Sequence, residues 1–303
     1  MNKSLENRLK LIAGDSNVRC DEPMSSHCTF RAGGTAKYYV IPDEYKKVRD
    51  VLRLCVEENI PYYVIGNGSN LLVQDDGFDG VIIEIDSALA KIEINGNEIV
   101  AKAGAKLSKI AVKALNESLT GFEFAGGIPG TLGGAVVMNA GAYGGEMKDV
   151  LRKVMVMDQS GKVFEIPAEE LQMGYRTSII KTAGYIVLGA VLSLKEGNLE
   201  EIKMLTRKLS EQRTSKQPLE YPSAGSTFKR PEGYFAGKLI MDSGLRGYQV
   251  GGAQVSEKHC GFVINRGNAS AAEIMELMRQ VEDKVEENSG VRLEAEVRRI
   301  GEF

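Results

Sequence analysis

Glycine is concentrated in one stretch of this chain. Residues 121–145 read GFEFAGGIPGTLGGAVVMNAGAYGG and hold nine glycines, where 34 glycines in 303 residues would give about three. Glycine weakens an ordinary helix or strand by roughly 0.5–1 kcal/mol per position, but it leaves backbone N–H groups open to close approach by a phosphate. Between these glycines stand apolar residues, namely Ile128, Leu132, Val136, Val137 and Met138. We therefore expect a buried loop that faces a nucleotide cofactor; a purely structural turn is the alternative.

Bulk composition narrows the class of protein. Hydrophobic residues make up 43% of the chain and charged residues 26%, as in ordinary soluble globular proteins. The formal net charge of −3 argues against a protein that binds nucleic-acid phosphates. The first 15 residues lack the apolar centre of a signal peptide, and the longest apolar run, 183–194, is too short to cross a bilayer. We expect a cytoplasmic enzyme or binding protein with no nucleic-acid or membrane partner.

Cysteine and histidine spacing gives no sign of a metal site or a thiol nucleophile. The chain contains no CxxC pair, so a structural zinc site is not predicted. Each histidine precedes a cysteine, but neighbouring side chains on a strand point to opposite faces, which disfavours a catalytic dyad. We expect reduced, mostly buried thiols. The residues concerned are Cys20, Cys28, Cys55, Cys260, His27 and His259.

A second glycine loop, Gly66–Leu71, follows a predicted strand at 61–65. Its pattern is close to the dinucleotide fingerprint GxGxxG, but Leu71 replaces the third glycine and no helical pattern follows. The chain also lacks the GxxxxGK[ST] motif of a P-loop. A Rossmann domain is therefore disfavoured, whereas phosphate binding by glycine loops is still expected.

Hydrophobic periodicity predicts a β-rich centre with inserted helices. A helix after Asp43 carries one apolar stripe of Val48, Val51, Leu52 and Cys55. Further helices are predicted at 106–119, 198–217 and 270–290, the last with a capping box formed by Ser270 and Glu273. Strands are predicted at 61–65, 81–85, 98–103, 151–158, 162–166 and 185–194, and a domain boundary at 195–200.

Three further segments carry side chains that could take part in catalysis or ligand binding: 174–178, 224–231 and 293–298. Taken singly, each is weak, because a Tyr-Arg pair is usually at the surface and a Gly-Ser pair is usually a turn. In LEAEVR the alternation places Glu294, Glu296 and Arg298 on one strand face, where charges are normally solvated.

Together these segments and the glycine loops resemble the UDP-N-acetylenolpyruvoylglucosamine reductases, flavoenzymes of peptidoglycan precursor synthesis. The resemblance covers nearly the whole chain. Because the extra loop found after Tyr175-Arg176 in longer members is missing, the chain is most similar to the short-form (type II) subclass. The motifs that carry the resemblance are Thr29–Gly34, Gly66–Leu72, Gly127–Gly130, Asn139–Gly144, Gly174–Arg176, Ala224–Phe228 and Leu293–Arg298.

The resemblance implies an α+β fold with three parts. A two-subdomain FAD-binding region of the PCMH/vanillyl-alcohol-oxidase type would occupy residues 1–80 and 81–197. A C-terminal α+β substrate domain would occupy residues 198–303, and its terminal strand at 291–303 would pack back on the FAD region.

The resemblance also implies the cofactor and its binding residues. FAD would be held non-covalently, NADPH would be the co-substrate and a UDP-sugar the substrate. The residues expected at FAD are Gly66, Asn67, Gly68, Ser69, Asn70, Leu71, Gly127, Ile128, Pro129, Gly130, Thr131, Gly134, Asn139, Gly141, Ala142 and Arg298.

The catalytic residues follow from the same register. Hydride transfer to C3 of the enolpyruvyl group leaves negative charge at C2, which the family's serine, here Ser226, would protonate. Arg176 would clamp the substrate carboxylate through paired N–H donors. Glu296 would stabilise the enolate, which requires that it donate a hydrogen bond; the register, not the spacing, selects it over Glu294.

Substrate contacts are expected at Tyr175, Lys216 and Arg230, which would hold the carboxylate or the diphosphate. Two alternatives stay open. Another FAD-dependent oxidoreductase of the same superfamily would share the glycine loops but would not need Ser226 together with Arg176 and Glu296. A non-catalytic flavin-binding or nucleotide-binding protein would keep only the loops.

Overall fold

The computed structural model describes residues 4–301, and its contacts divide the chain into two compact units. The first unit comprises Met1–Cys20, Tyr38–Asn67 and Gly80–Arg213; the second comprises Asp21–Lys37, Gly68–Asp79 and Thr214–Phe303. Both units are built from discontinuous segments, so this division does not follow the expected boundaries at residues 80 and 197. Because the expected domains are defined by ligands and not by compactness, they stay a prediction.

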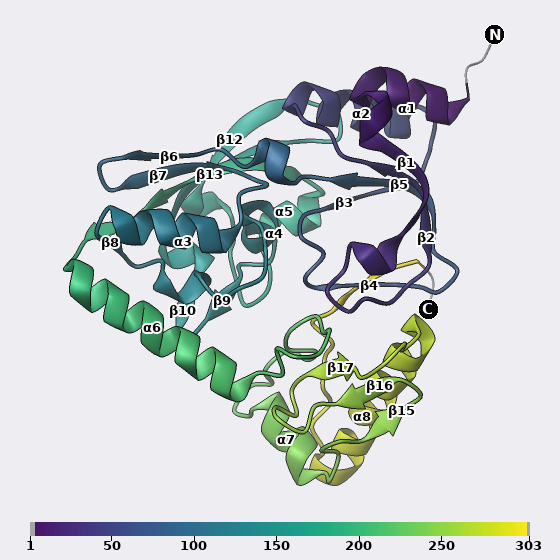
Figure 1. The fold of residues 1–303 in the computed structure, drawn as a ribbon, viewed down its shortest axis with the longest axis vertical. Helices are drawn as coiled ribbons and strands as arrows, with labels where there is room; N and C mark the ends of the chain where they lie inside the picture. The colour runs from purple at the N-terminus through teal and green to yellow at the C-terminus, as the bar shows by residue number, and fades with distance from the viewer. Residues whose placement is uncertain (1–3, 302–303) are drawn as a thin grey trace. The chain divides into compact units, whose positions relative to one another are not determined.

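A five-stranded antiparallel sheet is the centre of the first unit (Figure 1). Two helices, α3 (Leu107–Asn116) and α4 (Leu132–Val137), pack on it, and their buried apolar side chains join those of the sheet in one core. This arrangement confirms the β-rich centre. The strands lie in the order β12 (Val163–Pro167), β11 (Leu151–Met157), β13 (Ile186–Ser193), β7 (Glu98–Lys102) and β6 (Ile92–Asn95).

Two helices, α1 (Leu5–Ala13) and α2 (Tyr45–Glu57), contact each other and share a second core in the first unit. The apolar stripe predicted for α2 is buried as expected. The chain also forms a four-stranded sheet in the order β1 (Val18–Pro23), β2 (Thr35–Val40), β5 (Phe78–Glu84) and β3 (Tyr62–Ile65). Strands β1, β2 and β5 each run across a unit boundary in the sequence.

The glycine-rich stretch is not loop throughout. Residues Leu132–Val137 form the helix α4, which the glycine content did not predict. Close packing explains this helix, since a Cβ on Gly133 would lie 3.1 Å from Ala103 Cβ. The backbone N–H groups of Leu132 and Gly133 donate to Ala105 and Ala103 carbonyls, which satisfies the first turn. Short paired strands, β9 (Gly141–Ala142) with β10 (Gly145–Glu146), follow, and β8 (Leu119–Thr120) pairs with β14 (Lys195–Glu196).

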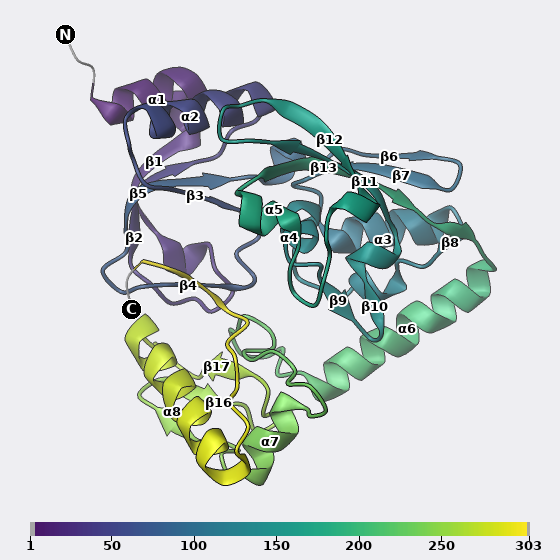
Figure 2. The same ribbon diagram turned by 180° about the vertical axis from the view of Figure 1, so that it is seen from behind.

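The second unit contains a small sheet of β15 (Gln249–Val250), β16 (Ala253–Val255) and β17 (Val263–Asn265) (Figure 1), of which Figure 2 shows β16 and β17 from behind. Helix α8 (Ala271–Ser289) packs against this sheet and against α7 (Ala236–Asp242). Its capping box and its end at Gly290 confirm the predicted helix.

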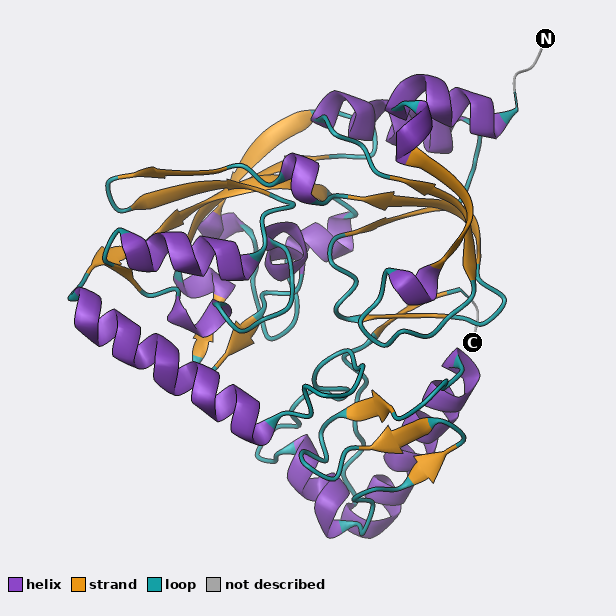
Figure 3. Cartoon of the chain, in the orientation of Figure 1, coloured by secondary structure: helices purple, strands orange, loops and turns teal. Residues whose placement is uncertain are grey.

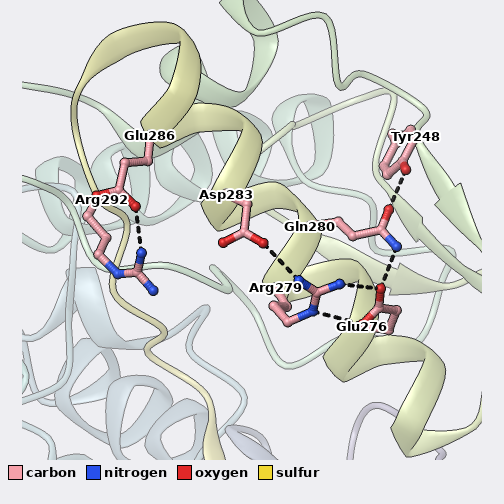
Figure 4. Close-up of polar contacts among 7 residues, drawn as sticks. All are labelled: Tyr248, Glu276, Arg279, Gln280, Asp283, Glu286 and Arg292. Carbon is pink, nitrogen blue, oxygen red and sulfur yellow. Dashed lines mark hydrogen bonds and ion pairs between the residues drawn. The ribbon is translucent and has the colours of Figure 1, made fainter.

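One face of helix α8 is buried and the other is exposed to solvent. The buried stripe consists of Ala271, Ile274, Leu277, Met278, Val281 and Val285. The exposed face carries a polar network in which Arg279 binds both Glu276 and Asp283 (Figure 4). Hydrogen bonds from Arg279 and Gln280 lower the pKa of Glu276 to about 2. The stripe is therefore core, as expected, and not a ligand site.

The end of the chain returns to the segment that follows the second glycine loop. Strand β18 (Arg298–Ile300) pairs in parallel with β4 (Leu71–Val73). Packing of the strand at 291–303 on the FAD-binding region stays a prediction, and residues 302–303 lie outside the described part of the chain. Helix α6 (Leu199–Lys216) confirms the helix predicted at 198–217 and is the long helix at the lower left of Figure 3. None of the helices within residues 4–301 is long and apolar enough to cross a membrane.

Candidate active site

Two glycine loops meet in the first unit. Gly66 lies so close to Thr131 that a Cβ at position 66 would be 2.2 Å from Thr131 Oγ1. The side-chain amide of Asn67 donates to the Pro129 carbonyl at 2.9 Å, which ties the loop after β3 to the Gly127–Gly130 loop. Only glycine allows the first contact, so Gly66 has a packing reason for its place in the sequence.

The next residues of the same loop lie in the second unit. Gly68 has φ +60, and a Cβ there would lie 1.9 Å from the His27 carbonyl oxygen. The Gly68 carbonyl accepts a hydrogen bond from Thr29 N–H. Thr29 Oγ1 is buried and has no hydrogen-bond partner within the described residues. A buried hydroxyl without a partner is rare, and beside a glycine loop it indicates a position where a bound polar group would complete the hydrogen bonding.

Each unit, taken by itself, carries features that suit part of a dinucleotide such as FAD. In the first unit two glycine loops are closely packed, and in the second unit a left-handed glycine lies beside an unsatisfied hydroxyl. Bare backbone N–H groups and hydroxyls are the donors that hold a pyrophosphate without competing charge. Among the residues expected there, Gly66, Asn67, Pro129 and Thr131 are brought together, and so are Gly68 and its neighbours.

Asn70 and Leu71 connect the glycine loop to the terminal strand. Asn70 Nδ2 donates to the Glu296 carbonyl at 3.1 Å, and the Asn70 carbonyl accepts from Arg298 N–H at 2.9 Å. Leu71 begins the pairing of β4 with β18 opposite Arg298. The loop expected at the cofactor therefore fixes the backbone on both sides of Val297.

Arg176 lies in a tight two-residue turn of the first unit. Gly174 and Thr177 exchange backbone hydrogen bonds across it, and helix α5 (Ile179–Ala183) follows. Arg176 has φ +56, which a non-glycine residue adopts rarely. Its guanidinium donates to the Gly141 carbonyl at 3.1 Å and lies 4.9 Å from the ring centre of Tyr175. Tyr175 is 45% exposed.

Ser226 and Glu296 belong to two paired segments of the second unit. Glu296 N–H donates to the Thr227 carbonyl at 2.8 Å, and Phe228 forms an antiparallel bridge with Ala295. The Thr227 side chain is fully buried and accepts from Val263 N–H, which anchors the residue next to Ser226. Ser226 itself is exposed and follows Gly225, whose φ is +77.

The structure distinguishes Glu294 from Glu296, which their spacing in the sequence could not do. Glu294 forms an ion pair with Lys229, and its side chain is 72% exposed. Glu296 is half-buried and lies opposite Thr227. Glu294 is therefore the solvated surface charge.

The two remaining substrate candidates, Lys216 and Arg230, are exposed in the second unit. Arg230 Nε donates to the Tyr234 carbonyl, and its guanidinium stacks 3.9 Å from the ring centre of Phe235. Burial lowers the pKa of His259, and the positive charge of Lys216 adds to this effect. Each cation can therefore contact a ligand, and Arg230 is already oriented by an aromatic ring.

Sequence reasoning missed Arg213 and Thr29. A Cβ on Gly127 would lie 3.0 Å from Arg213 Cδ, so this arginine packs on the first glycine loop. It is partly buried, and burial lowers its pKa. Its only sequence signal is a place near the end of a long helix. Thr29 begins the motif Thr29–Gly34, but nothing in the sequence shows that its hydroxyl is buried.

The other residues expected at FAD lie in or next to these loops and α4. They are Ser69, Gly130, Ile128, Gly134, Asn139 and Ala142.

Comparisons with known proteins show the family to which this chain is similar. Residues 36–167 match the family model described as "FAD binding domain", and residues 217–300 match "UDP-N-acetylenolpyruvoylglucosamine reductase, C-terminal domain". The chain is 53% identical to the reductase of that name from Alkaliphilus oremlandii over 94% of both chains. It is 51% identical to the one from Clostridioides difficile over 99% of both. The crystal structure of the Thermus caldophilus reductase superposes with a TM-score of 0.80 at 34% identity, covering 93% of this chain and 97% of that one.

A FAD-binding domain joined to this C-terminal domain defines a flavin-dependent oxidoreductase with an α+β fold, as expected. The sequence identity to the named reductases, and the share of the chain that it covers, identify the particular family. The chain belongs to the UDP-N-acetylenolpyruvoylglucosamine reductase family.

Proposed function

We propose that this chain reduces UDP-N-acetylglucosamine enolpyruvate to UDP-N-acetylmuramate, with NADPH as reductant and FAD as carrier, in cytoplasmic synthesis of peptidoglycan precursors. Family membership supports the substrate. The observation that carries the assignment of residues is the hydrogen bond from Glu296 N–H to the Thr227 carbonyl. It holds the segments of the expected acid and the expected enolate stabiliser in one register.

Bound FAD would supply the redox chemistry, taking hydride from NADPH and passing it to C3 of the enolpyruvyl double bond. The chain's own residues then manage the charge that this transfer creates. We assign Ser226 to donate the proton to C2. A hydroxyl is a weak acid, so it has to be held at the reacting carbon, and positioned proton transfer accelerates such a step by roughly 10²- to 10⁴-fold.

Arg176 and Glu296 are assigned to the negative charge that spreads into the substrate carboxylate. The Arg176 guanidinium donates one N–H to Gly141, and a guanidinium is the group that pairs with a carboxylate through parallel N–H donors. Glu296 contributes if it donates a hydrogen bond to the enolate. Donors aimed at developing charge are worth roughly 2.7–4 kcal/mol each in activation free energy.

Cofactor and substrate contacts complete the proposal. We assign the two glycine loops, with Thr131 and Arg298, to FAD. Tyr175, Lys216 and Arg230 are assigned to the substrate, because an exposed aromatic ring and two exposed cations suit a sugar diphosphate.

Anaerobic stopped-flow absorbance tests the proposal on the purified FAD-loaded protein. NADPH should bleach the flavin absorbance, and UDP-N-acetylglucosamine enolpyruvate should then restore it rapidly. Bleaching without recovery would reject this substrate and favour another oxidoreductase activity. Absence of bleaching would reject NADPH as the reductant.

A further inference from the structure

Asn139 lies in the glycine-rich stretch, and its side-chain amide donates two hydrogen bonds and accepts one. Its side chain is fully buried. Both N–H groups of its amide are used, one on the Gly174 carbonyl at 2.9 Å and one on Glu146 Oε2 at 3.1 Å. Its Oδ1 accepts from Lys148 N–H at 3.0 Å. An asparagine amide has two N–H donors, so neither is left for a cofactor.

One of these bonds ends on the turn that carries Arg176. Gly174 is the first residue of that turn, and its backbone N–H and carbonyl already pair with Thr177. The Asn139 amide therefore adds a second donor to the Gly174 carbonyl. Arg176 in turn donates to Gly141, two residues after Asn139. The glycine-rich stretch thus holds the turn at its start through Asn139 and at its arginine through Gly141.

The backbone conformation of the turn explains why these contacts are needed. Arg176 has φ +56 and Asn139 has φ +42, both in the left-handed region. That region is sparsely populated by residues other than glycine and asparagine, and arginine stays there only when its surroundings determine it. Ser178 supplies the other anchor, through its hydroxyl on the Val137 carbonyl. Ser178 lies after the turn, whereas Asn139 contacts the turn itself at Gly174.

We propose that Asn139 is a positioning residue that sets the orientation of the Arg176 guanidinium, and that it does not bind the cofactor through its side chain. The proposal rests on the proposed function, because Arg176 matters only if an anionic substrate is reduced. A displacement of about 1 Å in a reacting group can reduce a rate by about 100-fold. Loss of this one contact should therefore slow the step that needs Arg176 by about 10- to 100-fold.

Two variants separate positioning from folding. Asn139→Asp keeps the volume and the oxygen that accepts from Lys148, but it removes both donated N–H groups, the one to Gly174 and the one to Glu146. It also sets a second carboxylate beside Glu146, so it is made alone and together with Glu146→Gln, which removes that like-charge contact. Asn139→Ala removes all three contacts. Tyr45→Phe is the control, because it deletes a buried hydroxyl contact with the Leu188 carbonyl in the same unit and touches no part of the turn. For each, FAD content, melting temperature and both half-reactions are measured, alone and combined with Arg176→Lys.

We expect Asn139→Asp to retain FAD and to be reduced by NADPH within about twofold of the parent rate, while reoxidation by the enolpyruvyl substrate slows about 10- to 100-fold. In the Arg176→Lys background the same change should add little, since residues acting through one another are not additive. The positioning role would be overturned if the rate losses of Asn139→Asp and Arg176→Lys multiplied in the double variant. It would also be overturned if Asn139→Asp slowed reduction by NADPH as much as reoxidation by the substrate. If Asn139→Ala does not fold, Asn139→Asp alone decides. A parent protein that fails to reoxidise with this substrate would instead reject the proposed function.

Discussion

Gly66 faces the hydroxyl of Thr131 so closely that any side chain at position 66 would collide with it. The contact joins the loop after β3 to the loop before α4, and the Asn67–Pro129 hydrogen bond lies beside it. Both loops are assigned to FAD, so their separation is expected to set the width of the cofactor cradle.

Replacing Gly66 by alanine should therefore reduce FAD occupancy. The added Cβ would lie 2.2 Å from Thr131 Oγ1, and overpacking of this kind destabilises by about 1–3 kcal/mol. Flavin absorbance per protein after desalting measures the effect. Gly267→Ala is the control, because a Cβ there meets nothing within 4 Å; full occupancy in Gly66→Ala would contradict the close-contact argument.

Ser226→Ala should split the two half-reactions. The change removes the proposed proton donor but leaves the glycine loops intact, so FAD binding and bleaching by NADPH should persist. Reoxidation by the enolpyruvyl substrate should slow by roughly 10²- to 10⁴-fold. Stopped-flow absorbance follows both steps. Ser87→Ala, a change at a serine bonded only to Asp86 in its own turn, is the control. Turnover of Ser226→Ala at the parent rate would exclude this serine as the acid.

The two glutamates of the terminal segment form a matched pair for mutation. Glu296→Ala should lower kcat by roughly 10²- to 10³-fold if its side chain supports the enolate. Glu294→Ala should leave kcat unchanged, because Glu294 is an exposed partner of Lys229 and such pairs contribute at most about 1 kcal/mol to stability. Steady-state kinetics with NADPH measure both. Equal losses in the two variants would show that the segment, and not the Glu296 side chain, is what matters.

Stability should decrease as the pH falls below about 6.5, the ordinary pKa of histidine. Burial, aided by the charge of Lys216, holds the pKa of His259 below that value. The unfolded chain therefore binds the proton more readily than the folded one. The stabilisation is complete above about pH 6.5 and is lost as the pH falls through the folded-state pKa.

Urea unfolding at pH 7.5 and pH 5.0 measures this loss. His259→Gln keeps a group that can accept the hydrogen bond from Gly261 N–H but cannot titrate, so its unfolding free energy should change less with pH than that of the parent. Lys216→Met should also reduce the change, since it removes the neighbouring positive charge. An identical pH dependence in the parent and His259→Gln would assign the effect to other groups.

Local sequence rules were sufficient for much of the fold. The capping box at Ser270 and Glu273 and the glycine at 290 define the ends of α8, because caps satisfy backbone groups that lie within a few residues. The apolar stripe of α2 is buried as its spacing predicted. The failures share one cause. Glycine content argued against a helix at Leu132–Val137, but close packing of Gly133 on Ala103 stabilises one, and that contact depends on residues far apart in the chain.

The candidate site divides in the same way. Residue types, motif order and the family resemblance are properties of the sequence, and they identified Arg176, Ser226, Glu296 and both glycine loops as candidates. Tertiary structure decided what each group contacts. It placed Glu294 at the surface with Lys229, used both N–H groups of the Asn139 amide within the protein, and left the Thr29 hydroxyl buried without a partner. Spacing along a chain gives the periodicity of side chains, whereas burial and hydrogen bonding depend on which distant segments pack together.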